Sequence, residues 1–204
     1  MDVATAIEKR RAVKRFDPDY VIVEEDERRL FELTLLSPTA FNIQHWRFIV
    51  VRDRELREKI RAVTWGQPQI TEASLLVVIC ADTQAWRKDP ERYWAHAPEV
   101  QREGILEAIR MYYGDNPQRQ RDEALRSSGI AAQSLMLTAT AMGYESCPMD
   151  LSDFDAVAEL IGLPEDHLIA LFVAIGRGTE IPWPRGGKLP YEEVILTDRF
   201  DGEP

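Results

Sequence analysis

A dense group of basic side chains lies near the start of a chain that is otherwise acidic. Four cations, Arg10, Arg11, Lys14 and Arg15, fall within six residues, although the 204-residue chain has a formal net charge of −10. Successive arginines at a helix end can form forked hydrogen bonds with phosphate oxygens. They can equally well do no more than complement the dipole at the C-terminus of the helix. This segment alone leaves both interpretations open.

A second segment carries two amides that could recognise a planar ligand. Asn42 and Gln44 lie two residues apart between Ser37 and Trp46, in a loop that joins a predicted helix to a predicted strand. Each amide offers a donor and an acceptor, as the polar edge of a heterocycle requires. The alternative is an ordinary Asn-containing turn with Trp46 in the core. Taken alone, the segment favours the turn.

A third segment, residues 147–151 with the sequence Cys-Pro-Met-Asp-Leu, follows a predicted strand. Backbone N–H groups just beyond a strand end commonly dock a cofactor ring. A simple strand-to-helix turn is the alternative. The Gly176-Arg177-Gly178 run lacks the third glycine of a dinucleotide fingerprint and is followed by prolines, so we reject that reading.

Composition excludes several other classes of function. An acidic surface repels phosphate backbones and anionic lipids, so we expect neither nucleic acid nor membrane as a partner. Cys80 and Cys147 form no CxxC pair, and the three histidines lie far apart, so we expect reduced thiols and no metal site. The longest apolar run, residues 75–81, is too short to span a membrane. These features indicate a soluble, cytoplasmic protein.

The hydrophobic pattern predicts the elements that position these segments. Helices are expected near residues 2–9, 24–37, 54–63, 127–142 and 154–161, and strands at 47–51, 75–80, 144–148 and 168–175, with a last edge strand around 194–196. Residues 75–80 are apolar at every position, as in a central strand covered on both faces. We predict one α/β (α+β) domain, residues 1–204, in which a mixed sheet has helices on both faces. Residues 84–122 are expected to form a helical cap and 181–204 an extended tail.

In this order and at this spacing, the segments resemble the FMN-binding signature of the nitroreductase family. The matching motifs are Arg-Arg-x-x-Lys-x-Phe at 10–16, Ser-Pro-Thr-x-x-Asn-x-Gln-x-Trp at 37–46, Gly-hydrophobic-x-x-x-Pro-Met at 143–149 and Lys-Leu-Pro at 188–190. Each motif is weak alone, but the ordered combination is fairly specific. The resemblance implies a nitroreductase-like fold and an intertwined homodimer with FMN at the subunit interface.

The resemblance also assigns expected cofactor contacts. It implies that Arg10, Arg11 and Ala12 hold the phosphate and ribityl chain, that Lys14 approaches the pyrimidine edge, and that Lys188 and Arg185 return to the phosphate. The flavin would be reached from the partner subunit by Pro38, Thr39, Asn42 and Gln44. Backbone contacts beside flavin N5 would come from Pro148, Met149, Asp150 and Leu151. This sequence departs from the family pattern at three positions. Ala12 replaces a common hydroxyl residue, Leu151 a usual glycine, and Gly186 a frequent lysine.

The activity implied by the resemblance is transfer of hydride from NADH or NADPH, through flavin N5, to nitroaromatics, quinones or similar acceptors in a ping-pong cycle. The cofactor would supply this chemistry, so no catalytic side chain is expected. The alternatives are another flavin chemistry on the same fold, such as reductive dehalogenation, or a catalytically weak flavin-binding dimer. The Trp- and Tyr-rich stretch 86–113 would either wall the flavin or pack between helices.

Overall fold

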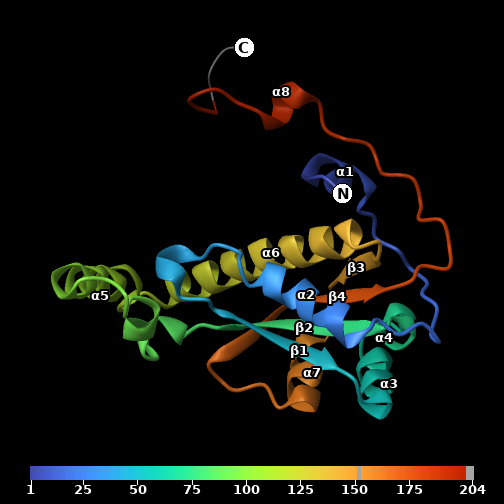
Figure 1. The fold of residues 1–204 in the computed structure, drawn as a ribbon, viewed down its shortest axis with the longest axis horizontal. Coiled ribbons are helices and arrows are strands. Elements are labelled where there is room, and N and C mark those ends of the chain that lie inside the picture. The colour runs from blue at the N-terminus through green and yellow to red at the C-terminus, as the bar shows by residue number, and fades with distance from the viewer. Residues whose placement is uncertain (151–152, 201–204) are drawn as a thin grey trace.

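The sheet at the centre of the molecule has four strands, in the order β1-β2-β4-β3. A computed structural model describes residues 1–150 and 153–200 (Figure 1). The strands are β1 (Trp46–Val51), β2 (Leu75–Asp82), β3 (Glu145–Met149) and β4 (His167–Gly176), and every ladder between them is antiparallel. β3 lies at an edge, where Pro148 is tolerated because its missing N–H leaves no inner ladder unpaired.

Helices cover both faces of this sheet, as predicted. The helices are α1 (Val3–Lys9), α2 (Glu24–Thr34), α3 (Arg54–Ala62), α4 (Gln69–Glu72), α5 (Glu99–Tyr113), α6 (Pro117–Ala141), α7 (Phe154–Ile161) and α8 (Tyr191–Val194), with short 3₁₀ turns η1 (Ala40–Asn42), η2 (Ala85–Arg87) and η3 (Pro90–Tyr93). Successive side chains of β2 point to opposite faces. Val77 packs in the cluster that includes α2 and α6, whereas Val78 packs in the cluster that includes α3, α4 and α7. The predicted α/β (α+β) class with helices on both faces of the sheet is confirmed, whereas the described sheet is antiparallel and not mixed.

The long helix α6 begins ten residues before the predicted start at 127. The Asn116 side chain caps it by accepting the N–H of Arg119 over 2.9 Å, and Pro117 occupies the first turn, where proline is favoured. The predicted cap, residues 84–122, therefore contains η2, η3, α5 and the first residues of α6. No helix in the described part of the chain is both long and apolar enough to cross a bilayer.

The C-terminal tail leaves the body of the molecule. Residues 181–190 are extended, as their prolines and glycines predict, and α8 follows (Figure 1). The predicted edge strand at 194–196 is wrong, because Val194 ends α8 and residues 195–200 join no sheet. An alternating pattern forms a strand only where a neighbouring strand offers hydrogen bonds. Residues 195–200 pair with no strand in the described part of the chain.

Candidate functional site

A cationic pocket lies between the end of α1 and the tail. Its volume is about 530 Å³, within the range of small-molecule sites. It is lined by Arg10, Arg11, Ala12, Lys14, Glu180, Ile181, Pro182, Trp183, Pro184, Arg185, Gly186, Gly187 and Lys188. Five of these side chains are cationic and one is a carboxylate. The structure therefore joins the two predicted phosphate-binding segments, which are 170 residues apart in the sequence.

Hydrogen bonds hold the tail against the end of α1. Arg185 Nη2 donates to the carbonyl oxygens of Ile7, Glu8 and Arg10 over 3.1, 3.0 and 2.8 Å. Cations are favoured at this end of a helix, where carbonyl groups have no intrahelical partner. The Arg11 guanidinium donates to the carbonyl of Trp183. Arg185 thus braces the pocket wall as well as adding charge to it.

The electrostatics of the pocket favour an anion. Burial lowers the pKa of Arg10, and the nearby charges of Arg185 and Arg11 lower it further. Neither Arg10 nor Lys188 has a carboxylate partner among the described residues. An anionic ligand would relieve this like-charge repulsion and form charge-assisted hydrogen bonds.

The backbone after Arg11 runs along β3 and brings in the third predicted segment. Val13 N–H donates to the Ser146 carbonyl over 3.1 Å, and an isolated parallel bridge pairs Ala12 with Ser146. Lys14 Nζ lies 3.6 Å from Cys147 Sγ. The first and third segments therefore form one continuous surface within a single chain.

Gln69 is a polar residue of this surface that the sequence analysis missed. It is 2% exposed at the start of α4, and its Nε2 donates to Cys147 Sγ over 3.7 Å. Its Oε1 has no hydrogen-bond partner among residues 1–150 and 153–200, an arrangement that is costly for a buried oxygen. The Gly66-Gln67-Pro68-Gln69 turn was the available signal. The sequence gives no indication that this turn meets Lys14 and Cys147.

In the Pro148–Leu151 segment, the described residues are only partly accessible to a ligand. Pro148, Met149 and Asp150 line a shallow hollow of about 330 Å³ with Ala170 and Leu171. The Met149 side chain is 4% exposed and packs in the core, so only its backbone remains for a ligand. The Asp150 carbonyl accepts from Gln67 Nε2 over 3.2 Å. Leu151 lies outside the described residues.

The amide loop does not reach the cationic pocket in this chain. Pro38, Thr39, Asn42 and Gln44 are absent from the pocket lining, and the loop lies toward α5, away from the end of α1 (Figure 1). Asn42 is exposed, whereas Gln44 is half-buried and lines a different groove beside α2 and β1. One chain thus presents two separated parts of the predicted site.

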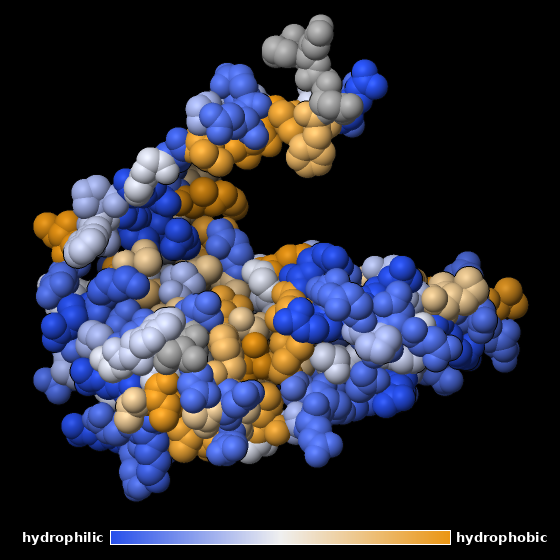
Figure 2. Space-filling model, turned by 180° about the vertical axis from the view of Figure 1, so that it is seen from behind, coloured by the Kyte–Doolittle hydropathy of each residue, from blue (hydrophilic) through white to orange (hydrophobic). Residues whose placement is uncertain are grey.

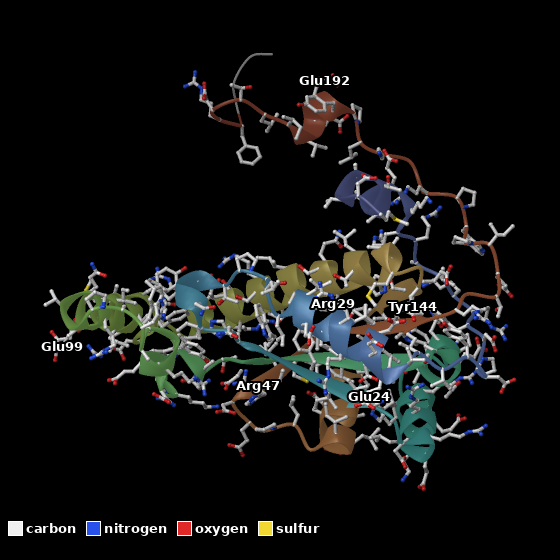
Figure 3. All side chains as sticks on the ribbon, in the orientation of Figure 1. Glu24, Arg29, Arg47, Glu99, Tyr144 and Glu192 are labelled. Carbon is white, nitrogen blue, oxygen red and sulfur yellow. The ribbon has the colours of Figure 1, made fainter. Side chains whose placement is uncertain are left out.

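A second charged cluster lies at the far end of the sheet. Lys88 Nζ is 2.9 Å from Asp82 and 2.6 Å from Asp166, and His167 Nδ1 is 2.6 Å from Asp166. Arg47, labelled in Figure 3, also contacts the buried Asp82 carboxylate, with its Nη2 3.2 Å from Asp82 Oδ2. Ligand atoms of Asp82, Asp166 and His167 lie within 4.8 Å of one another, although no metal site was expected. The Lys88 ammonium already supplies the positive charge between the two carboxylates.

Comparison with known proteins gives a consistent result. The profile of the nitroreductase family matches residues 7–177. The DrgA protein of Synechocystis is 52% identical over 180 residues, covering 88% of this chain and 86% of its own. The ydfN structure from Bacillus subtilis covers 95% of this chain and 97% of its own, with a TM-score of 0.89 and 27% identity. An FMN-bound structure from Exiguobacterium sibiricum covers 96% and 97%, with a TM-score of 0.88 and 25% identity. The chain belongs to the nitroreductase family of oxidoreductases.

Proposed function

We propose that the protein is an FMN-dependent oxidoreductase that transfers hydride from NADH or NADPH to nitroaromatics, quinones or similar electron-poor acceptors. The main observation behind this proposal is the pocket, whose lining has five cationic side chains and one carboxylate. The Exiguobacterium sibiricum structure, which holds FMN, supports the choice of cofactor. MhqN of Bacillus subtilis, 28% identical over 200 residues, is an NAD(P)H nitroreductase by name, which supports the choice of reductant.

The residues present fit FMN. Arg10, Arg11 and Lys188 would hold the phosphate, with the wall of the pocket braced by Arg185. Lys14 and Gln69, which converge on Cys147 Sγ, would hold the polar edge of the ring. The unpartnered Oε1 of Gln69 is an acceptor suited to a ring N–H. Ala12 offers no hydroxyl, so the phosphate would rely on the arginines.

When bound, FMN would supply the hydride-transfer centre in a ping-pong exchange between the nicotinamide and the acceptor. The role of the protein is then to bind, orient and polarise. Lys14 would stabilise negative charge at the polar edge of the ring, because a fixed cation needs no reorganisation as charge develops. We assign no nucleophile or general base.

We further propose that the site is completed across a homodimer. The tail exposes a series of large apolar side chains, among them Ile181 at 93%, Trp183 at 86% and Phe200 at 94%. Figure 2 shows hydrophobic surface along this projecting tail. Monomers rarely expose apolar surface in this way. A second copy would cover the tail and could bring Asn42 to the cationic pocket.

The absorbance spectrum of the purified protein with FMN, before and after anaerobic addition of NADH or NADPH, tests the activity. Binding followed by bleaching of the flavin band supports the proposal. Turnover of a nitroaromatic, a quinone and a halophenol then separates quinone or nitro reduction from dehalogenation. A flavin that binds but is not bleached would indicate a catalytically weak dimer. A protein that takes up no FMN would refute the proposal.

Subunit complementation tests the shared site. The Arg10→Ala and Asn42→Ala homodimers should each be impaired in both sites. Co-expressed as a heterodimer, they should regain one intact site, formed by Arg10 of one subunit and Asn42 of the other. If both residues served the same site within one chain, the heterodimer would contain no intact site and would gain nothing.

A further inference from the structure

The amide loop has an unusual backbone. Phe41, Asn42 and Gln44 have φ angles of 54°, 56° and 53°, in the left-handed region that residues other than glycine rarely occupy. Such conformations persist only where the surrounding structure enforces them. Here they leave Ile43 fully buried and Asn42 exposed. The left-handed turns therefore decide which way the two amides face.

Hydrogen bonds hold two of these three residues, and two of the donors, Trp94 and Arg47, lie outside the loop. Trp94 Nε1 donates to the carbonyl of Phe41 over 3.1 Å. Arg47 Nη1 donates to the carbonyl of Gln44 over 3.1 Å, and Thr39 Oγ1 accepts the Gln44 N–H over 3.0 Å. The Trp94 donor belongs to the segment 84–113 and lies 53 residues from Phe41 in the sequence.

Aromatic packing joins the same segment to the loop. The Phe41 ring lies 5.5 Å from Tyr112 and 6.3 Å from Tyr113, both edge-on. Ile43 packs in a cluster with Ala85, Leu106, Ile109 and Tyr113. The segment 84–113 thus packs against the buried side of the loop, and its Trp94 donates a hydrogen bond to the Phe41 carbonyl.

We propose that Trp94 is a positioning residue for the flavin site. Its indole N–H fixes the Phe41 carbonyl, keeps Phe41 and Asn42 in the left-handed conformation and so directs Asn42 outward, toward the pocket of a second copy. This proposal rests on the proposed function, because it assumes that Asn42 contacts the cofactor. The conformational part can be tested without any cofactor.

The substitution Trp94→Phe keeps an aromatic ring and removes only the N–H donor. Trp86→Phe is a matched control, because Trp86 belongs to the same segment and its buried Nε1 has no hydrogen-bond partner among the described residues. Hydrogen exchange of the peptide covering residues 39–46 measures the loop. We expect exchange to be about fivefold faster in W94F, the factor that corresponds to one net hydrogen bond, and unchanged in W86F. Equal exchange in the two variants overturns the proposal.

The FMN dissociation constant tests the functional part. It should rise about fivefold in W94F, again the factor for one net hydrogen bond, and stay unchanged in W86F. In an Asn42→Ala background, W94F should have little further effect, because the loop no longer presents the amide. Additive effects of the two substitutions would overturn the role of Trp94. If the unaltered protein binds no FMN, the proposed function fails, and the exchange measurement alone decides whether Trp94 holds the loop.

Discussion

Two charged clusters at opposite ends of the molecule differ in how their charges are balanced. At the end of the sheet, the buried Asp82 carboxylate is surrounded by Lys88, Arg47 and His167, and Asp166 pairs with two of these groups. In the pocket beside α1, five cations face one carboxylate. The charges of the first cluster are balanced within the chain, whereas the second has an excess of positive charge.

The contrast separates structural charge from binding charge. A buried carboxylate that lost its partners would be strongly destabilising, so the Asp82 cluster is satisfied internally. The cations beside α1 are partly solvated and can bind a ligand of opposite charge. Excess of one charge sign, rather than the number of charges, distinguishes the proposed binding site.

The largest effect is expected from removing the binding charge. The double substitution Arg10→Gln and Arg11→Gln should raise the FMN dissociation constant about 100-fold or more, because each charge-assisted hydrogen bond contributes about 1.5–3 kcal/mol. Stability should change little. Fluorescence titration of FMN measures the affinity, and Arg29→Gln, on the exposed face of α2, is the control (Figure 3). Unchanged affinity in the double variant would show that these arginines only complement the helix dipole.

Removing a structural charge should instead lower stability. Lys88→Met leaves the 1%-exposed Asp82 side chain with Arg47 as its main cation, so we expect a loss of about 1–3 kcal/mol in the free energy of unfolding. Urea denaturation measures this loss. FMN affinity should be preserved, since Lys88 does not line the pocket. A stable variant with weakened FMN binding would reverse the assignment of the two clusters.

A smaller effect is expected at Gln69, the buried amide beside Cys147. Gln69→Leu should weaken FMN binding about fivefold, the loss of one net neutral hydrogen bond, while leaving stability nearly unchanged because Oε1 has no partner in the part of the chain that the structure describes. The exposed Gln118→Leu on α6 is the control. A drop in stability without any change in FMN affinity would make Gln69 a structural residue.

The smallest effect concerns Asp166 and depends on pH. Hydrogen bonds from Lys88 and His167 lower the pKa of Asp166 from 3.8 to about 2. A depressed pKa contributes stability above the unfolded value, which is lost as pH falls from about 4 toward about 2. Because this carboxylate is largely solvated, Asp166→Asn should cost less than about 1 kcal/mol at pH 6. The difference from the unaltered protein should shrink by pH 3, and urea titrations at the two pH values would detect this. A constant difference would exclude ionisation as its source.

The core of the fold was predictable because the local pattern of apolar residues indicates which side chains are buried. The run Leu75–Cys80 is apolar at every position, and it forms the central strand β2 with helices on both faces. The start of α6 was placed too late, since its first turns are polar and carry little hydrophobic signal. The edge strand at 194–196 was wrong because alternation alone cannot supply a neighbouring strand.

The sequence by itself determined the cationic run, the two amides and the post-strand turn, since each is a matter of residue type and local spacing. Tertiary structure alone decided that Arg10 and Lys188 share a pocket, that Gln69 joins Lys14 at Cys147, and that Asn42 does not line this pocket. The physical reason is that these relations depend on strand pairing and on a left-handed loop supported by a distant tryptophan. Such long-range packing leaves no trace in the spacing of neighbouring residues.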